Sequence, residues 1–138
     1  MNVAFFLIPK KEVAFVKGTY TMRQAMEKMK YHRYTSIPIL NEKGHYIGTL
    51  REGDLLWRMF DSNQLISIND IEHTLLADID LQSHNVPIPI HAEMEDIISR
   101  ATEQNFIPVV DDGGYFIGII RRREIIDYLA GQYLKTQK

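Results

Sequence analysis

The side chains best suited to hold an anionic ligand occur at two matched places in the sequence. Arg51 and Asp54 stand three residues apart, and Arg121 and Glu124 repeat this spacing later in the chain. An ionised carboxylate can accept hydrogen bonds from the vicinal hydroxyls of a ribose, and a guanidinium group suits a phosphate. Asp is also a preferred residue at helix starts without any ligand. Both roles of Asp54 therefore stay open, and they can coexist.

The rest of the sequence shows no catalytic apparatus. It contains no Ser-His-Asp order, no Walker loop and no dinucleotide glycine fingerprint, and it has no cysteine. The five histidines lack the spacing that would place two of them on one metal. Arg122 and Arg123, beside Arg121, are equally well explained as a solvated surface run. We expect no enzyme, no metal site and no required cofactor.

Composition narrows the class of protein further. The 138 residues are 45% hydrophobic and 25% charged, with a net charge of -2, as in one globular domain or a domain of two halves. Such a balance offers no broad cationic face for nucleic acid. The most apolar stretch, Val3 to Ile8, is too short to cross a bilayer. We therefore expect a protein that binds neither nucleic acid nor membrane. The lack of cysteine fits a reducing compartment, so we expect a cytoplasmic location.

The two acid and arginine pairs belong to a repeated unit. Ile37 to Leu40 and Tyr46 to Gly48 recur 70 residues later as Ile107 to Val110 and Phe116 to Gly118. Upstream, apolar residues at helical spacing recur 72 residues apart: Met22, Ala25, Met26 and Met29, then Met94, Ile97, Ile98 and Ala101. The second copy therefore lacks two residues between its first helix and its next strand.

Local signals predict the elements of each copy. Thr21 and Gln24 form a capping box at the first helix, and Asn41 to Gly44 and Asp111 to Gly114 supply turns. We expect opening strands at 13–16 and 86–90, and a short helix at 69–76. Each copy then reads strand, helix, strand, strand, helix, an α+β (α/β-like) fold. The expected organisation is a first repeat at 1–62 with the N-terminal segment, a connector at 63–78, a second repeat at 79–130 and a tail at 131–138.

This unit resembles the cystathionine β-synthase (CBS) domain, and the pair resembles a Bateman module, over about residues 8–60 and 79–130. The resemblance implies two repeats about a pseudo-two-fold axis, with adenosine-containing ligands bound in a cleft between them. The family pattern Gly-x-x-Ser/Thr-x-x-Asp appears as Gly48 to Asp54, with Arg51 in place of the hydroxyl residue. The second copy, Gly118 to Glu124, departs at both polar positions. The first copy is therefore the better candidate site.

The resemblance also implies which further residues line the nucleotide pocket. In the first copy these are Thr35, Ser36, Ile37 and Pro38, approached from the other side by Lys17, Gly18 and Thr19. Ile37 also fits a buried strand. In the second copy the corresponding residues include Phe106 and Pro108, beside Arg121 and Glu124. Phe106 would stack on a base or fill the space left by the two-residue deletion.

We therefore expect a regulatory sensor of an adenosine nucleotide: AMP, ADP, ATP or cyclic di-AMP. No effector domain is recognised in the sequence, so the sensor would form a homodimer and act in trans on a partner protein that the sequence does not identify. The alternative is a structural or interaction module whose pockets have lost binding. It is motivated by the missing hydroxyl position in both copies and the missing Asp in the second.

Overall fold

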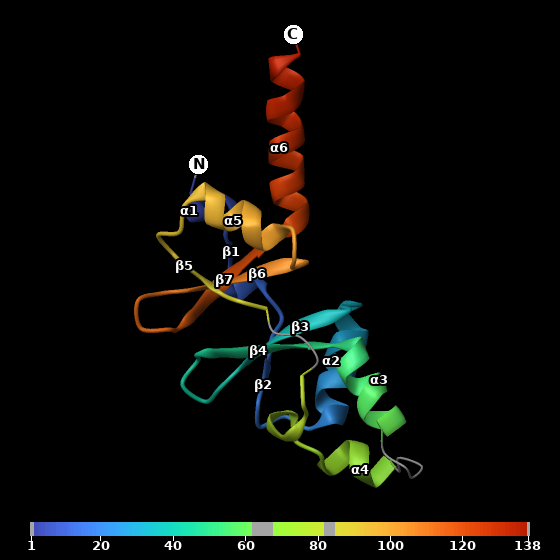
Figure 1. The fold of residues 1–138 in the computed structure, drawn as a ribbon. Coiled ribbons are helices and arrows are strands. Elements are labelled where there is room, and N and C mark those ends of the chain that lie inside the picture. The colour runs from blue at the N-terminus through green and yellow to red at the C-terminus, as the bar shows by residue number, and fades with distance from the viewer. Residues whose placement is uncertain (1, 62–67, 82–84, 138) are drawn as a thin grey trace. The chain divides into compact units, whose positions relative to one another are not determined.

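The structure, a computed structural model, describes residues 2–61, 68–81 and 85–137. The chain divides into two compact units: Ala14–His84, and Met1–Val13 together with Asn85–Lys138. Each unit holds one copy of the repeat (Figure 1). Each also has its own hydrophobic core. The fold is of the expected α+β class, with two repeats of strands and helices. Residues 63–67 of the expected connector lie outside the described residues.

The unit Ala14–His84 follows the order strand, helix, strand, strand, helix. Its elements are β2 (Val16–Lys17), α2 (Met22–His32), β3 (Ser36–Leu40), β4 (Tyr46–Arg51) and α3 (Glu52–Asp61), then α4 (Ile68–His73) and a 3-10 turn, Leu76–Asp78. β2 pairs parallel with β3, and β3 pairs antiparallel with β4. The opening strand is shorter than the expected 13–16, and the connector helix ends before the expected residue 76.

Alternation along β3 and β4 places their side chains on two faces of this sheet. One face packs against α2 through three buried aliphatic residues, Ile37, Ile39 and Leu50. The opposite face carries the alternate positions, which the strand register sets side by side: Ser36 opposite Arg51, and Pro38 opposite Thr49. The sheet therefore separates the core of the unit from the face that carries the candidate arginine.

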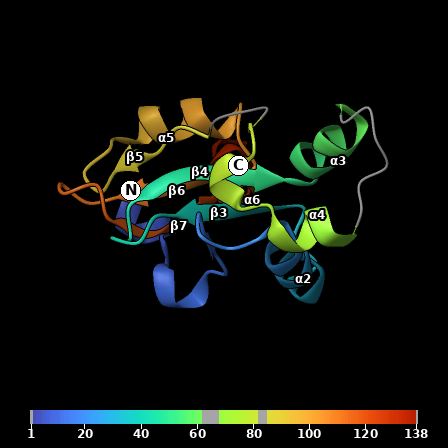
Figure 2. The ribbon, with the colours of Figure 1, turned by 90° about the horizontal axis from the view of Figure 1, so that it is seen from below.

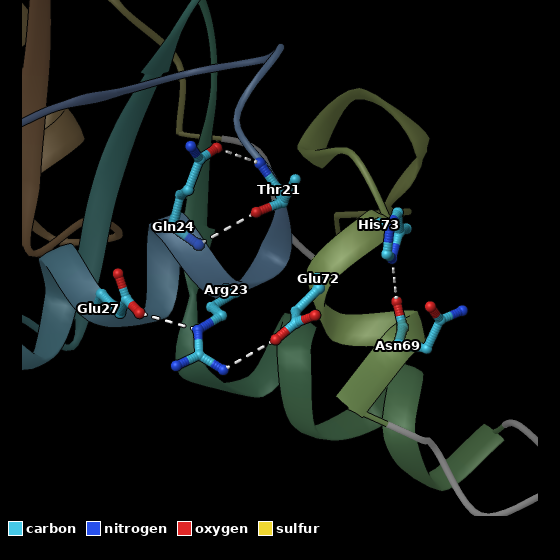
Figure 3. A network of polar contacts seen from close by, with 7 residues as sticks. All are labelled: Thr21, Arg23, Gln24, Glu27, Asn69, Glu72 and His73. Atoms are coloured by element: carbon cyan, nitrogen blue, oxygen red, sulfur yellow. Dashed lines mark hydrogen bonds and ion pairs between the residues drawn. The ribbon is translucent and has the colours of Figure 1, made fainter.

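The start of α2 is held by the expected capping box. Thr21 Oγ1 accepts the Gln24 N–H at 3.2 Å, and Gln24 Oε1 accepts the Thr21 N–H at 2.9 Å (Figure 3). Arg23, in the first turn, bonds Glu27 on the same helix and Glu72 on α4. α2 and α4 accordingly lie side by side, which Figure 2 shows from below. The connector helix is thus part of the packing of the first repeat.

The other unit is built on a four-stranded sheet in the order β1-β7-β6-β5. Its elements are α1 (Val3–Phe6), β1 (Ile8–Pro9), a 3-10 turn (Lys10–Glu12), β5 (Ile88–Pro89), α5 (Met94–Ala101), β6 (Phe106–Val110), β7 (Phe116–Arg121) and α6 (Arg122–Thr136). β5 and β6 pair parallel as β2 and β3 do. The expected tail at 131–138 is thus helix as far as Thr136.

The N-terminal segment packs on the second repeat, whereas the sequence analysis grouped it with the first. β1 pairs antiparallel with β7, and Val3 and Phe6 of α1 are buried in the core that contains Ile97 and Ile107. Burial of these apolar side chains is favourable, and pairing with β1 supplies hydrogen-bond partners to the outer edge of β7. The described part of the N-terminal segment therefore completes the sheet of a repeat that lies far along the chain.

Candidate functional site

Asp54 lies in the first turn of α3 and is 1% exposed. Its Oδ2 atom accepts the backbone N–H of Arg51 at 2.8 Å, which is the returning bond of a capping box. The helix-cap role foreseen for Asp54 is therefore present in the structure. A carboxylate has about four lone-pair sites and can accept several hydrogen bonds at once.

Arg51 ends β4, where it belongs to the face opposite the core. Tyr46, at the start of the same strand, shares a 2.6 Å hydrogen bond with the fully buried Thr49. Burial raises the pKa of Tyr46 to about 12, although the bond to Thr49 and the positive charge of Arg51 both lower it. The guanidinium group is thus close enough to Tyr46 to affect its ionisation.

Neither Tyr46 nor Thr49 is among the site residues predicted from the sequence. A signal was nevertheless present, because the matching residues of the second repeat are Phe116 and Ile119, which have no polar side-chain atom. The first repeat alone therefore carries a polar pair on this strand. That pair lies beside Arg51, whose neighbour across the sheet is Ser36.

The β3 residues implied by the resemblance fall into separate environments. Ser36 and Pro38 lie on the face that carries Arg51. The side chain of Ile37 instead lies in the hydrophobic core and is 0% exposed to solvent. Thr35 is exposed and lines a groove of about 490 Å³ between α2 and α3, whose apolar lining includes Met26 and Met59. Ile37 is thus a core residue of a buried strand, which was the alternative to a pocket-lining role.

Lys17, Gly18 and Thr19 are not brought to Arg51. The parallel register pairs Lys17 with Leu40, at the end of β3 that is remote from Ser36, a separation of about 13 Å along the strand. Gly18 is fixed there by backbone bonds to Leu40 and Ala77, and Thr19 Oγ1 donates to Glu42 at 3.0 Å. The register of β2 and β3, which joins residues distant in sequence, decides this placement, and the approach of these residues to a ligand from the other side stays a prediction.

In the second repeat, Arg121 and Glu124 are both exposed, in contrast to the buried Asp54. Phe106 and Pro108 are buried on the face of β6 opposite the core, and both roles expected for Phe106, stacking on a base and filling space, stay predictions. Arg122 is not a solvated surface residue, because its Nε atom donates to the carbonyls of Ala101 at 2.7 Å and Gln104 at 2.9 Å. This side chain therefore caps the end of α5.

Two classes of site are absent from the described part of the chain. No group of three His, Cys, Asp or Glu side chains among those residues is placed to hold a metal ion. Within the same residues, no helix combines the length and the apolar character that crossing a bilayer requires.

Residues 7–61 and 76–131 each match the CBS domain family. The chain belongs to the CBS domain family. A curated relative is the chloroplastic CBS domain-containing protein CBSX1 of Arabidopsis thaliana, 24% identical over an alignment that covers 91% of this chain and 62% of the relative. The chain spans about three fifths of the length of the curated relatives it matches.

Solved CBS structures share the fold at low sequence identity. CbpB of Listeria monocytogenes, solved in complex with c-di-AMP, is 20% identical with a TM-score of 0.79, covering 97% of this chain and 98% of that one. The CBS domain of a bacterial CNNM/CorC family Mg²⁺ transporter, solved in complex with ATP, is 19% identical with a TM-score of 0.74, covering 95% of this chain and 88% of that one.

The two CBS repeats share a backbone plan but differ in polarity. The first carries a buried acid at its second helix, with Tyr46 and Thr49 on the preceding strand. The second has an exposed Glu124 at the matching place and apolar residues on the strand. The two repeats therefore differ in the side chains that they place at this junction.

Proposed function

We propose that the protein is a regulatory sensor that binds an adenosine nucleotide through its first CBS repeat and acts on a partner protein in trans. The ligand classes are AMP, ADP, ATP and cyclic di-AMP. The observation that carries this proposal is the buried Asp54 carboxylate, held next to Arg51 at the junction of β4 and α3. Support also comes from fold neighbours that bind c-di-AMP or ATP.

Each side chain has a distinct part in this proposal. The carboxylate of Asp54 accepts the ribose hydroxyls while it retains its bond to the Arg51 N–H, and burial strengthens such charge-assisted bonds. The guanidinium of Arg51 binds phosphate, and Ser36 adds a hydroxyl on the same face. This is a binding role that needs no general base and no metal set.

A sensor also needs a surface through which it acts. Large apolar side chains are exposed on α3 and α6: Leu56, Trp57, Phe60, Ile126, Leu129, Tyr133 and Leu134. Such side chains are typical of surfaces that contact another protein. We propose that the protein forms a homodimer and that the bound nucleotide changes its fit to the regulated partner. Any such change requires unequal affinity of the nucleotide for the two states. Sedimentation velocity with and without nucleotide tests the dimer.

The experiment that tests nucleotide binding is titration calorimetry with AMP, ADP, ATP and cyclic di-AMP on the wild-type protein. We expect at least one of them to bind, and Arg51→Ala to weaken ATP binding more than adenosine binding, because phosphate is the proposed partner of this residue. Arg123→Ala is the matched control, since the Arg123 side chain is 87% exposed and remote from the β4 junction in sequence. If none of the four ligands binds, the protein is instead an interaction module with degenerate pockets.

A further inference from the structure

Gln104, just before β6, holds a neighbouring stretch of backbone with both ends of its carboxamide. Its side chain is 4% exposed within the second repeat. Oε1 accepts the Val86 N–H at 2.9 Å, while Nε2 lies 3.3 Å from the Val86 carbonyl oxygen and 3.3 Å from that of Phe106. One planar amide thus satisfies the donor and the acceptor of a single residue.

These backbone groups lie where the chain has not yet joined the sheet. Val86 precedes β5, whose parallel pairing with β6 begins at Ile88 opposite Val109. The adjacent Asn85, also buried, donates its Nδ2 to the Phe106 carbonyl at 3.4 Å. A backbone N–H and C=O side by side form a donor and acceptor edge that a planar amide or the edge of an adenine ring can match. In the second repeat, the carboxamide of Gln104 occupies this edge.

The first repeat has no carboxamide at the corresponding place. Val16 pairs with Ile39 as Ile88 pairs with Val109, and this register makes Ala14 the counterpart of Val86. The counterpart of Gln104, two residues before the matching strand, is Tyr34. A tyrosine carries one hydroxyl at the far end of its ring, so it cannot present a paired donor and acceptor to one backbone residue.

We propose that Gln104 is an internal ligand that closes the Val86 backbone edge of the second repeat, which limits the chain to one nucleotide, bound at the first repeat. The closure rests on the contacts of Gln104 alone, whereas the count of one nucleotide rests on the proposed function. Gln104 is thus a specificity-determining residue that excludes a ligand from one of two similar repeats.

Hydrogen exchange tests the closure without any nucleotide. We expect the Val86 amide to exchange slowly in the wild-type protein and at least about 100-fold faster in Gln104→Ala, because the acceptor of its hydrogen is removed. Gln24→Ala is the matched control, since it also removes a carboxamide that accepts a backbone N–H, on α2 of the other repeat. Rapid exchange of the wild-type Val86 amide would overturn the proposal.

Rescue by a free amide distinguishes an internal ligand from a merely structural residue. We add acetamide at about 50 mM, and free adenine in a separate experiment, to Gln104→Ala and to wild type. We expect each compound to raise the melting temperature of the variant by about 2 °C or more beyond any rise in wild type, since each can bind the vacated edge. If Gln104→Ala does not fold, Gln104→Ser serves, because its shorter side chain also leaves the edge vacant. Equal responses of variant and wild type to both probes would contradict the proposal.

The count of bound nucleotides is measured by native mass spectrometry of the wild-type protein with saturating ATP or cyclic di-AMP. We expect one molecule per chain, with occupancy reduced in Asp54→Ala and retained in Glu124→Ala. Two molecules per chain would overturn the closure while leaving the proposed function intact. If neither nucleotide binds, the proposed function fails, and hydrogen exchange and amide rescue still decide whether Gln104 closes the edge.

Discussion

At the scale of single residues, one carboxylate of the first repeat has a structural role and is also the acceptor that we propose for the ribose hydroxyls. The bond from Asp54 Oδ2 to the Arg51 N–H fixes the turn from β4 into α3, and it also holds the acid next to the arginine. A buried acid in this place can therefore serve the fold and a ligand together. The two roles are separable by substitution because only one of them needs the negative charge.

We expect Asp54→Ala to lower the free energy of unfolding by about 1 kcal/mol, as the loss of a cap does, and to weaken nucleotide binding by roughly 10- to 150-fold. Asp54→Asn retains an oxygen that can accept the Arg51 N–H, so it should recover most of the stability but not the binding. Denaturant titration and calorimetry measure the two effects. Wild-type affinity in Asp54→Ala would remove this residue from the site.

Tyr46 predicts a dependence of stability on alkaline pH. Burial raises its pKa to about 12 in the folded protein, above the value of about 10 expected in the unfolded chain. Between these values the folded state binds more protons, so this contribution is fully present below about pH 10 and is lost as the pH rises towards 12. We expect the free energy of unfolding to fall by up to about 1.4 kcal/mol per pH unit in this window.

The measurement compares wild type with Tyr46→Phe by denaturant titration from about pH 9 to 12. The variant lacks the ionisable hydroxyl, so its stability should fall less steeply, and at neutral pH it should be about 1 kcal/mol less stable because Thr49 loses its partner. Parallel pH profiles would show that Tyr46 does not titrate as the structure indicates.

At the scale of elements, the arginine run at the start of α6 divides its roles by position. Arg122 reaches the carbonyls of Ala101 and Gln104, so it ties α6 to the end of α5. Arg123, one residue on, is largely exposed and meets only Asp127 of its own helix at 4.0 Å among the interactions of the described residues. Neighbouring residues of the same type thus differ because the helix turns them to different sides.

We expect Arg122→Ala to lower the free energy of unfolding by about 1.5–3 kcal/mol, because the backbone carbonyls of Ala101 and Gln104 lose a charged donor. Arg123→Ala should change it by about 0.5 kcal/mol or less, as exposed ion pairs do. Thermal and urea denaturation of both variants provide the comparison. Equal losses in the two variants would contradict the division.

At the scale of the whole molecule, the N-terminal segment precedes the first repeat in sequence but packs with the second repeat. The N-terminal strand β1 joins the sheet of the second repeat, and this is possible because Gly118 has no side chain. A Cβ atom at Gly118 would overlap the carbonyl oxygen of Ile8 and would lie 2.9 Å from Leu7 Cδ1. The glycine shared by both repeats is therefore a packing requirement in the second.

We expect Gly118→Ala to displace β1 from β7 and to lower the free energy of unfolding by about 1–3 kcal/mol. Gly48→Ala is the matched control in the first repeat, where the new Cβ would meet only the terminal Leu81 Cδ1 at 2.6 Å, which can rotate away. Limited proteolysis of residues 1–13 and urea denaturation report the effect. An N-terminal segment as protected in Gly118→Ala as in wild type would contradict it.

The sequence by itself determined the two repeats, their α+β plan and the position of Asp54 at a helix start. These follow from periodicity, turn chemistry and capping, which act between residues close together in the chain. Only the tertiary structure decided that Lys17 to Thr19 lie at the remote end of β3, that Ile37 belongs to the core, and that Arg122 and Gln104 bind backbone carbonyls. Strand register and burial join residues distant in sequence, and no local pattern encodes which of them will meet.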